Sequence, residues 1–120
     1  MTEGDISLTV LPQADGQRKN RPVVVLRKMP PFDDWLVCGV STQLHQAVAG
    51  FDDAVHVGDA DYTASGLKAS SLIRLGFLAV IPETQLLGAI GALAPQRHRR
   101  LLDRLSEHLS AGRPEDQSTI

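Results

Sequence analysis

Cysteine is almost absent from the chain, and so are long hydrophobic runs. The single cysteine, Cys38, excludes an internal disulfide and a cysteine-rich zinc site. It lies in the apolar run 35–40, which predicts a small buried residue. No apolar run approaches the ~20 residues that a membrane span needs, and residues 1–5 lack the basic and apolar regions of a secretory signal. We therefore expect a cytoplasmic protein that does not contact a membrane.

Aromatic residues and net positive charge are also scarce. One tryptophan, one tyrosine and three phenylalanines leave valine, leucine, isoleucine and alanine to fill the interior. Hydrophobic residues form 42% of the 120 residues, which is enough for one domain with its own core. The net charge of −2 and the pI of about 6.0 argue against nucleic-acid binding by overall charge, so any such binding would need a local basic patch.

Motifs for metal ions, nucleotides and serine nucleophiles are missing as well. The histidines are scattered and form neither HxH nor HExxH spacing, so we expect no bound metal; they are His45, His56, His98 and His108. The chain has no GxxxxGK[ST] or GxGxxG loop, and no serine lies on a GxSxG elbow. These absences predict a protein without a cofactor and argue against a Ser-His-Asp hydrolase.

Short apolar segments, alternating or β-branched, predict strands along most of the chain. We expect these strands over residues 6–11, 22–26, 35–40, 54–57, 71–75, 78–81 and 86–93. Gly76 would separate the fifth and sixth of them, while Gly88 and Gly91 would allow a bulge or a close backbone approach in the last one. Six or seven short strands without helices between them favour a small barrel or sandwich over a βαβ arrangement.

Turn residues mark the connections between these strands. Residues 12–20 are a predicted loop, residues 28–34 a turn, and residues 59–65 a turn or a single helical turn. In the stretch 41–53, the apolar residues suit one helical turn that Gly50 would cut short.

One helix is predicted at the end of the chain, over residues 94–111. Leucines with helical spacing would lay it on the strands, Pro95 suits its first turn, and Gly112 suits the position just past its end. We therefore expect one domain over residues 1–112, followed by a flexible tail over residues 113–120.

Two groups of basic residues contrast with the slightly acidic average. The first lies in the loop before the second strand and in the turn after it: Arg18, Lys19, Arg21, Arg27 and Lys28. It is either a solvated loop or a lip that binds phosphate through guanidinium contacts. The second group, which starts at Arg97 and ends at Arg104, lies in the half of the predicted helix where the dipole disfavours cations. It is either an exposed helix face or a surface paired with RNA, a carboxylate partner or acidic neighbours.

Five segments, in order, resemble the MazF/PemK family of toxins. They are Gly4-Asp5-Ile6, the "RPV" strand Arg21-Pro22-Val23-Val24-Val25-Leu26, the strand end Val37-Cys38-Gly39-Val40-Ser41-Thr42, the pair Gly66-Leu67 with Ser70-Ser71-Leu72-Ile73-Arg74, and Leu86 through Leu93 before a leucine-rich helix. Their order and spacing agree with the family over residues 4–110, which is nearly the whole chain.

The resemblance implies a mainly β fold, a small SH3-like barrel with a C-terminal helix, and usually a homodimer. Members of the family are sequence-specific endoribonucleases that cut single-stranded RNA such as mRNA without a metal ion. A partner antitoxin, encoded beside the toxin, holds each of them inactive. By this resemblance the chain is the toxin of a toxin–antitoxin pair, and its cleavage would leave a 2′,3′-cyclic phosphate.

The resemblance also implies the residues of the site. Arg21 matches the arginine that the family uses at the scissile phosphate, and Ser41 matches the hydroxyl residue that closes the third strand. Arg74 matches a basic residue that some members use in catalysis or RNA contact. Further RNA contacts are expected from basic and hydroxyl residues beside these: Arg18, Lys19, Thr42 and Lys68.

The chain departs from the family at Gly76, two residues after Arg74, where those members carry an acid. Its acidic overall charge is a second departure. Both favour an alternative, a non-catalytic module that binds RNA or protein on the same fold. Phe32, Trp35 and Phe51 are the aromatic side chains considered for base stacking, but burial in the core explains each of them better.

Overall fold

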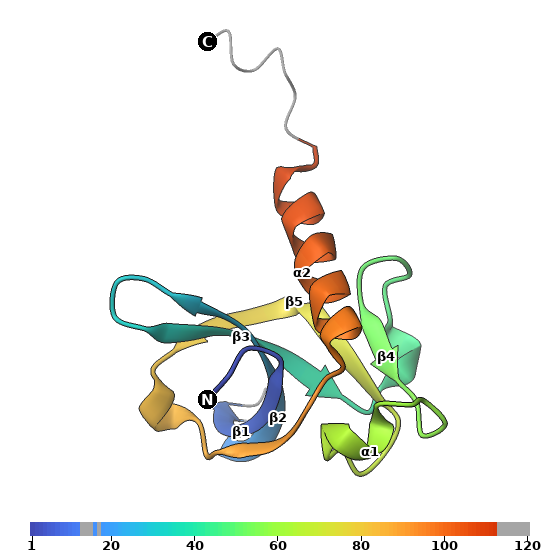
Figure 1. Cartoon of the computed structure of the whole chain (residues 1–120), viewed down its shortest axis with the longest axis horizontal. Helices are drawn as coiled ribbons and strands as arrows, with labels where there is room; N and C mark the ends of the chain where they lie inside the picture. Colours follow the sequence, from blue (N-terminus) through green and yellow to red (C-terminus); the bar gives the residue numbers. More distant parts are fainter. Residues whose placement is uncertain (13–15, 17, 113–120) are drawn as a thin grey trace, which may run out of the picture.

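One antiparallel sheet and a long helix make up the structure, a computed structural model that describes residues 1–12, 16 and 18–112 (Figure 1). The six strands found in these residues lie in the order β4-β5-β3-β2-β1-β6. Their bounds are β1 Asp5–Pro12, β2 Arg18–Met29, β3 Asp34–Ser41, β4 Asp53–Val55, β5 Ser71–Ile81 and β6 Ala89–Ala92. The helical elements are α1 Tyr62–Ser65, α2 Pro95–Ser110 and the 3₁₀ turns η1 Leu44–Gln46 and η2 Glu83–Gln85.

The sheet curls into a half-barrel, which confirms the predicted mainly β class. Register shifts interrupt the β1–β6, β2–β3 and β3–β5 pairs, and such bulges bend a sheet. The curl brings the edge strand β6 against α1, which lies between β4 and β5 in the chain. A Cβ atom on Gly91 would lie 2.3 Å from the backbone of Ser65. The predicted close approach at Gly91 is therefore confirmed, and it brings α1 into contact with β6.

The face of the sheet under α2 holds the larger hydrophobic core (Figure 1). Leu101 and Leu105 of α2 are buried against alternate residues of β2 and β3 such as Val24 and Cys38. Burying side chains of this size stabilises a fold by about 1.5–3 kcal/mol each. The burial predicted for Cys38 is confirmed, and so is the leucine stripe that lays the helix on the strands.

The opposite face carries a smaller core at one end only. This cluster is formed by Val23, Val25, Trp35, Val37, Ile81 and Leu86, without a residue from either helix. The connection around η2 is fixed over β1, because the Ser7 hydroxyl donates to the Gly88 carbonyl at 2.6 Å and the Thr9 hydroxyl to the Gln85 carbonyl at 2.8 Å. The part of this face near the start of β2 and the end of β3 contributes no residue to that cluster.

Some predicted boundaries are wrong. β2 extends from Arg18 to Met29, so the first basic group lies in a strand and not in a loop and a turn. β5 continues through Gly76 as one strand, because it pairs with β3 on both sides of that glycine. The last strand is shorter than expected, since β6 covers only Ala89–Ala92.

The helical predictions agree more closely. Pro95 is the first residue of α2, and Gly112 follows its end with a φ of 73°. The predicted single turn in 59–65 is α1. No helix of the described residues is long and apolar enough to cross a membrane. The predicted tail and residues 13–15 and 17 of the predicted loop lie outside the described residues.

Candidate functional site

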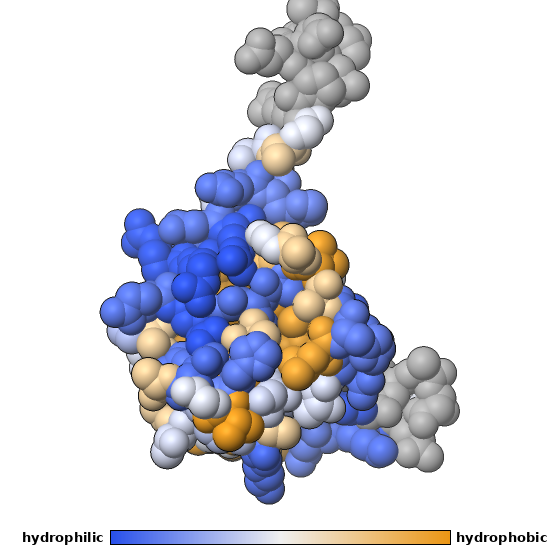
Figure 2. All heavy atoms as spheres, turned by 90° about the vertical axis from the view of Figure 1, so that its right-hand side faces the viewer, coloured by the Kyte–Doolittle hydropathy of each residue, from blue (hydrophilic) through white to orange (hydrophobic). Residues whose placement is uncertain are grey.

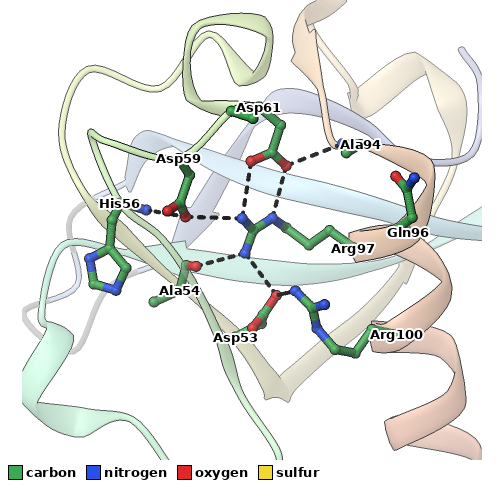
Figure 3. Close-up of a pocket in the computed structure, with 10 residues that line it drawn as sticks. Asp53, Ala54, His56, Asp59, Asp61, Ala94, Gln96, Arg97 and Arg100 are labelled. Carbon is green, nitrogen blue, oxygen red and sulfur yellow. Dashed lines mark hydrogen bonds and ion pairs between the residues drawn. The ribbon is translucent and has the colours of Figure 1, made fainter.

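The first turn of α2 is tied to β4 and α1 by the guanidinium group of Arg97 (Figure 3). Its Nε and Nη2 atoms donate to the two carboxylate oxygens of Asp61 at 2.8 and 3.0 Å, and Nη2 also donates to Asp59 at 3.0 Å. Its Nη1 atom donates to Asp53 at 2.9 Å and to the Ala54 carbonyl at 2.7 Å. A guanidinium group has five N–H donors, so each donor of Arg97 has a partner within the protein.

Three aspartates surround the guanidinium group of Arg97 in a half-buried setting. The side chains of Arg97 and Asp61 are each 11% exposed. Hydrogen bonding to Arg97 holds the pKa of Asp61 below its usual range, and the same contact raises the pKa of Arg97. The pKa of Asp59 is also lowered, first by the hydrogen bond from the His56 backbone N–H and then by Arg97. Among the described residues, no group of three or more His, Cys, Asp or Glu is placed to hold a metal ion.

The same network continues along α2. Arg100 donates to Asp53 at 2.9 Å, and Arg104 donates to the Asp52 carbonyl at 2.8 Å. The second basic group is therefore paired with acidic neighbours, and the exposed-face interpretation is wrong for Arg97. An open hollow lies beside this network (Figure 3). Because the donors of Arg97 are all used, that guanidinium cannot also bind a phosphate, and we assign the network to stability.

Three predicted site residues project from the face of the sheet opposite α2, outside the small core of that face. Arg74 lies directly opposite Gly39, and Gly39 lies opposite Val23. Directly opposed residues of an antiparallel pair point to the same face, and so do residues two apart in one strand. Arg21 lies two residues before Val23 in β2, and Ser41 lies two residues after Gly39 in β3. Arg21, Ser41 and Arg74 therefore share one face, on three adjacent strands.

The side chains of Arg21, Ser41 and Arg74 are accessible and carry groups that can donate hydrogen bonds. Neighbouring strands lie ~4.8 Å apart, so β2 and β5 are separated by roughly 10 Å and two arginine side chains can reach one group between them. Arg21 is exposed and Arg74 half-buried, and neither forms an ion pair with another described residue. The Ser41 hydroxyl oxygen accepts a hydrogen bond from the Gln43 N–H at 3.0 Å, which fixes its position and leaves its O–H free to donate.

Of the four residues predicted to contact RNA, some lie beside this sheet face and others lie elsewhere in the fold. Lys19 is exposed in β2 two residues before Arg21, on the same side of the strand, whereas Arg18 alternates to the other side. Thr42 is exposed directly after β3. Lys68 is exposed in the connection from α1 to β5 and does not belong to the row on the three strands.

A bulge of three residues interrupts β5 directly after Arg74. The residues 75–77 have no opposite partner, because Arg74 pairs with Gly39 while Leu78 pairs with the preceding residue of β3. Gly76 faces open space within this bulge and supplies no carboxylate. Phe77 lies over Gly39, since a Cβ atom there would be 2.9 Å from Phe77 Cδ1. An aromatic ring thus lies on the face that carries Arg74, and it is 42% exposed.

The sequence pattern did not indicate Phe77, because it predicted separate strands over residues 71–75 and 78–81 and left residue 77 between them. The signal that would have found it is a glycine opposite Arg74, which is visible only with the register. Burial is confirmed for Trp35, which is 3% exposed, and Phe51 packs against the larger core and the His108 ring. It is wrong for Phe32, which is 82% exposed in the β2–β3 turn.

A protein-family model described as PemK-like, MazF-like toxin of type II toxin–antitoxin systems matches residues 2–109. The chain belongs to this toxin family. The resemblance noted in the five sequence segments is thereby confirmed over nearly the same span. A comparison with curated proteins gives no match.

A solved structure of the MazF type has the same fold. It is the Mycobacterium tuberculosis toxin MazF-mt6, which superposes with a TM-score of 0.60 at 22% sequence identity, over 88% of this chain and 95% of that one. The predicted barrel with a C-terminal helix is therefore the fold of the MazF-like toxins. At this level of identity the likeness concerns the fold and not the individual site residues.

Proposed function

We propose that this protein is the toxin of a toxin–antitoxin pair and cuts single-stranded RNA at specific sequences without a metal ion. The observation that carries the proposal is the shared, accessible sheet face of Arg21, Ser41 and Arg74 in a chain of this toxin family. The contrast with Arg97 supports the proposal, because every N–H donor of that arginine is bound to an oxygen of the protein itself. Arg21 and Arg74 have no carboxylate partner among the described residues, so they are available to a phosphate.

RNA carries its own nucleophile for this reaction. The ribose 2′-hydroxyl loses its proton and its oxygen attacks the adjacent phosphorus, while the bond from phosphorus to the 5′-oxygen breaks and that oxygen gains a proton. The products are a 2′,3′-cyclic phosphate and a free 5′-hydroxyl end. A protein accelerates the step by holding the hydroxyl in line and by stabilising the extra negative charge on the phosphate.

Each residue of the face has a role in this scheme. Arg21 contacts the non-bridging oxygens of the scissile phosphate through two N–H groups, and arginine keeps its proton in proteins, so it stabilises charge and does not act as a base. Ser41 donates its O–H to a phosphate oxygen, with its own oxygen held by the Gln43 N–H. Arg74 adds positive charge from β5. Groups of this kind typically lower a barrier by about 2–4 kcal/mol each when they are preorganised.

Gly76 limits what the protein contributes to proton transfer. Some family members carry an acid at the matching position, whereas this chain has open space there. Rate acceleration would then rest on charge stabilisation and positioning by the two arginines. The same departure favours the alternative function, a module on the same fold that binds RNA or protein without cutting.

Partners follow from the family. A type II toxin implies an antitoxin protein that binds it, and we propose a homodimer acting in the cytoplasm. The surface offers places for protein contact, because hydrophobic areas lie between hydrophilic ones on the side seen in Figure 2. Exposed large apolar side chains of the described residues include Leu44, Val48 and Val57, from the segments on either side of β4.

The experiment incubates the purified protein, free of antitoxin, with a long single-stranded RNA in EDTA and analyses the ends of the fragments. Discrete cuts with 2′,3′-cyclic phosphate ends are expected, and a 2′-deoxy residue placed at a mapped cut should abolish cleavage there. RNA that stays intact after incubation with folded protein would refute the proposed endoribonuclease activity. Binding of that RNA without cleavage would favour the non-catalytic module.

A further inference from the structure

The bulge in β5 presents an aromatic ring where neither core requires one. Phe77 belongs to neither hydrophobic cluster and is 42% exposed. Its ring rests on the backbone of Gly39, the residue directly opposite Arg74, with Cδ1, Cγ and Cβ all within 3.5 Å of the place where a Cβ atom of Gly39 would lie. Any larger residue at position 39 would displace this side chain, which is held at its Cβ, Cγ and Cδ1 atoms and is nevertheless 42% exposed.

The position of this ring matches the needs of a single-stranded nucleic acid. Bulges occur beside active sites, where they re-aim a side chain, and here the bulge holds Phe77 on the same face as Arg74 and Ser41. Exposed aromatic rings next to phosphate-binding cations are the usual platforms for unpaired bases, because every base has a π-face that can stack. Among the five aromatic residues of the chain, Phe77 alone is both exposed and placed on this face.

We propose that Phe77 is a stacking platform for one base of the bound single-stranded RNA, next to the phosphate held by Arg21 and Arg74. This inference rests on the proposed function and deepens it by naming how a base is held. Stacking on Phe77 contributes to substrate binding and positions the nucleotide beside the scissile phosphate. It requires an unpaired base, so duplex RNA does not use the ring.

A purely structural role gives a different expectation. Aromatic side chains can cover a glycine in a sheet and shield its backbone. If Phe77 only shields Gly39, then Phe77→Ala lowers the melting temperature and leaves RNA affinity unchanged. The stacking role predicts the reverse order of effects, with a clear loss of affinity in a protein that remains folded.

The experiment measures binding of a random-sequence single-stranded 2′-fluoro RNA pool, which lacks the 2′-hydroxyl nucleophile and so cannot be cut. Stacking is worth about 1–3 kcal/mol per base, which corresponds to about 5- to 150-fold in affinity. Phe77→Ala should weaken binding within that range, and Phe77→Tyr should restore it. Gly39→Ala, which displaces the ring, should also weaken binding. The matched control is Phe32→Ala, an exposed aromatic in the turn at the far end of β2 and β3 (Figure 1), which should bind like the unmodified protein.

A second measurement identifies the base. In an oligonucleotide with a mapped cut site, single abasic positions are scanned with the unmodified protein and with Phe77→Ala. One abasic position should weaken binding to the unmodified protein and have little further effect on the variant. Equal affinity of Phe77→Ala and the unmodified protein for the 2′-fluoro pool would overturn the stacking role while leaving the proposed function intact. No binding by the unmodified protein would instead contradict the proposed function itself.

Discussion

Replacing Arg97 with alanine should destabilise the protein strongly, although Arg97 lies outside the proposed site. The substitution leaves three aspartates without their central cation. Asp61 keeps the hydrogen bond from the Ala94 N–H at 3.2 Å, and Asp53 keeps Arg100 at 2.9 Å. Arg99→Ala is the matched control, because Arg99 lies in the same helix, is 78% exposed and pairs with the exposed Asp103.

The size of the effect follows from burial. Removing one partner of a buried ion pair costs about 3–5 kcal/mol. The partial compensation at Asp53 and Asp61, together with the exposure of Asp59 at 33%, places Arg97→Ala near the lower limit, about 3 kcal/mol. For a domain of this size 1 kcal/mol corresponds to roughly 3–5 °C, so we expect a loss of about 10–15 °C in melting temperature. Arg99→Ala should cost less than about 1 kcal/mol.

The assay is thermal or urea unfolding followed by the fluorescence of Trp35, the single tryptophan, which is buried. It should be repeated from pH 7 to pH 3. The folded-state pKa values of Asp59 and Asp61 are lowered, so their contribution is complete above the ordinary aspartate pKa of ~3.9 and is lost as pH falls through the lower folded values. The gap between the unmodified protein and Arg97→Ala should therefore narrow below about pH 4.

Two results would refute this reasoning. The first is a melting temperature for Arg97→Ala that equals that of Arg99→Ala at pH 7. The second is a gap between the unmodified protein and Arg97→Ala that does not change between pH 7 and pH 3. Folded Arg97→Ala should also retain RNA cleavage, and a specific loss of cleavage would show that Arg97 contacts RNA.

Two further predictions test the packing. Gly91→Ala should lower the free energy of unfolding by about 2 kcal/mol or more, because its Cβ would lie 2.3 Å from the Ser65 backbone; Gly76→Ala, in open space, should change it by less than about 0.5 kcal/mol. Equal effects in urea titrations would contradict the close approach. Burial, aided by the charge of Asp52, raises the pKa of Cys38 to about 12, so its thiol should react with iodoacetamide at pH 8 much more slowly in the native protein than in urea, and rapid native labelling would contradict that burial.

Local patterns predicted much of the fold. The alternation in β1, the β-branched run of β2 and the leucine stripe of α2 each specify an element through the faces they must bury. The sequence did not predict that β5 continues through Gly76. A glycine is a local breaker, yet pairing with β3 on both sides of the bulge outweighs that preference.

The site could be predicted only in part. Arg21 and Arg74 were named from the family resemblance, but the face they share follows from the register through Gly39. The partners of Arg97 lie 36 to 44 residues away in the chain, so the helix sequence alone could not distinguish a structural network from an RNA-binding surface. The position of Phe77 could not be predicted for the same reason, because its contact with Gly39 joins residues that lie far apart in the chain.

The most direct test of the central claim compares single-turnover cleavage of one mapped RNA in EDTA by the unmodified protein, Arg21→Ala and Arg99→Ala. If Arg21 stabilises the charge on the scissile phosphate, then Arg21→Ala should cut about 10²- to 10³-fold more slowly. Arg99→Ala, on the helix over the other face of the sheet, should cut at the unmodified rate. Cleavage by folded Arg21→Ala at the unmodified rate would contradict the assignment of this sheet face as the active site.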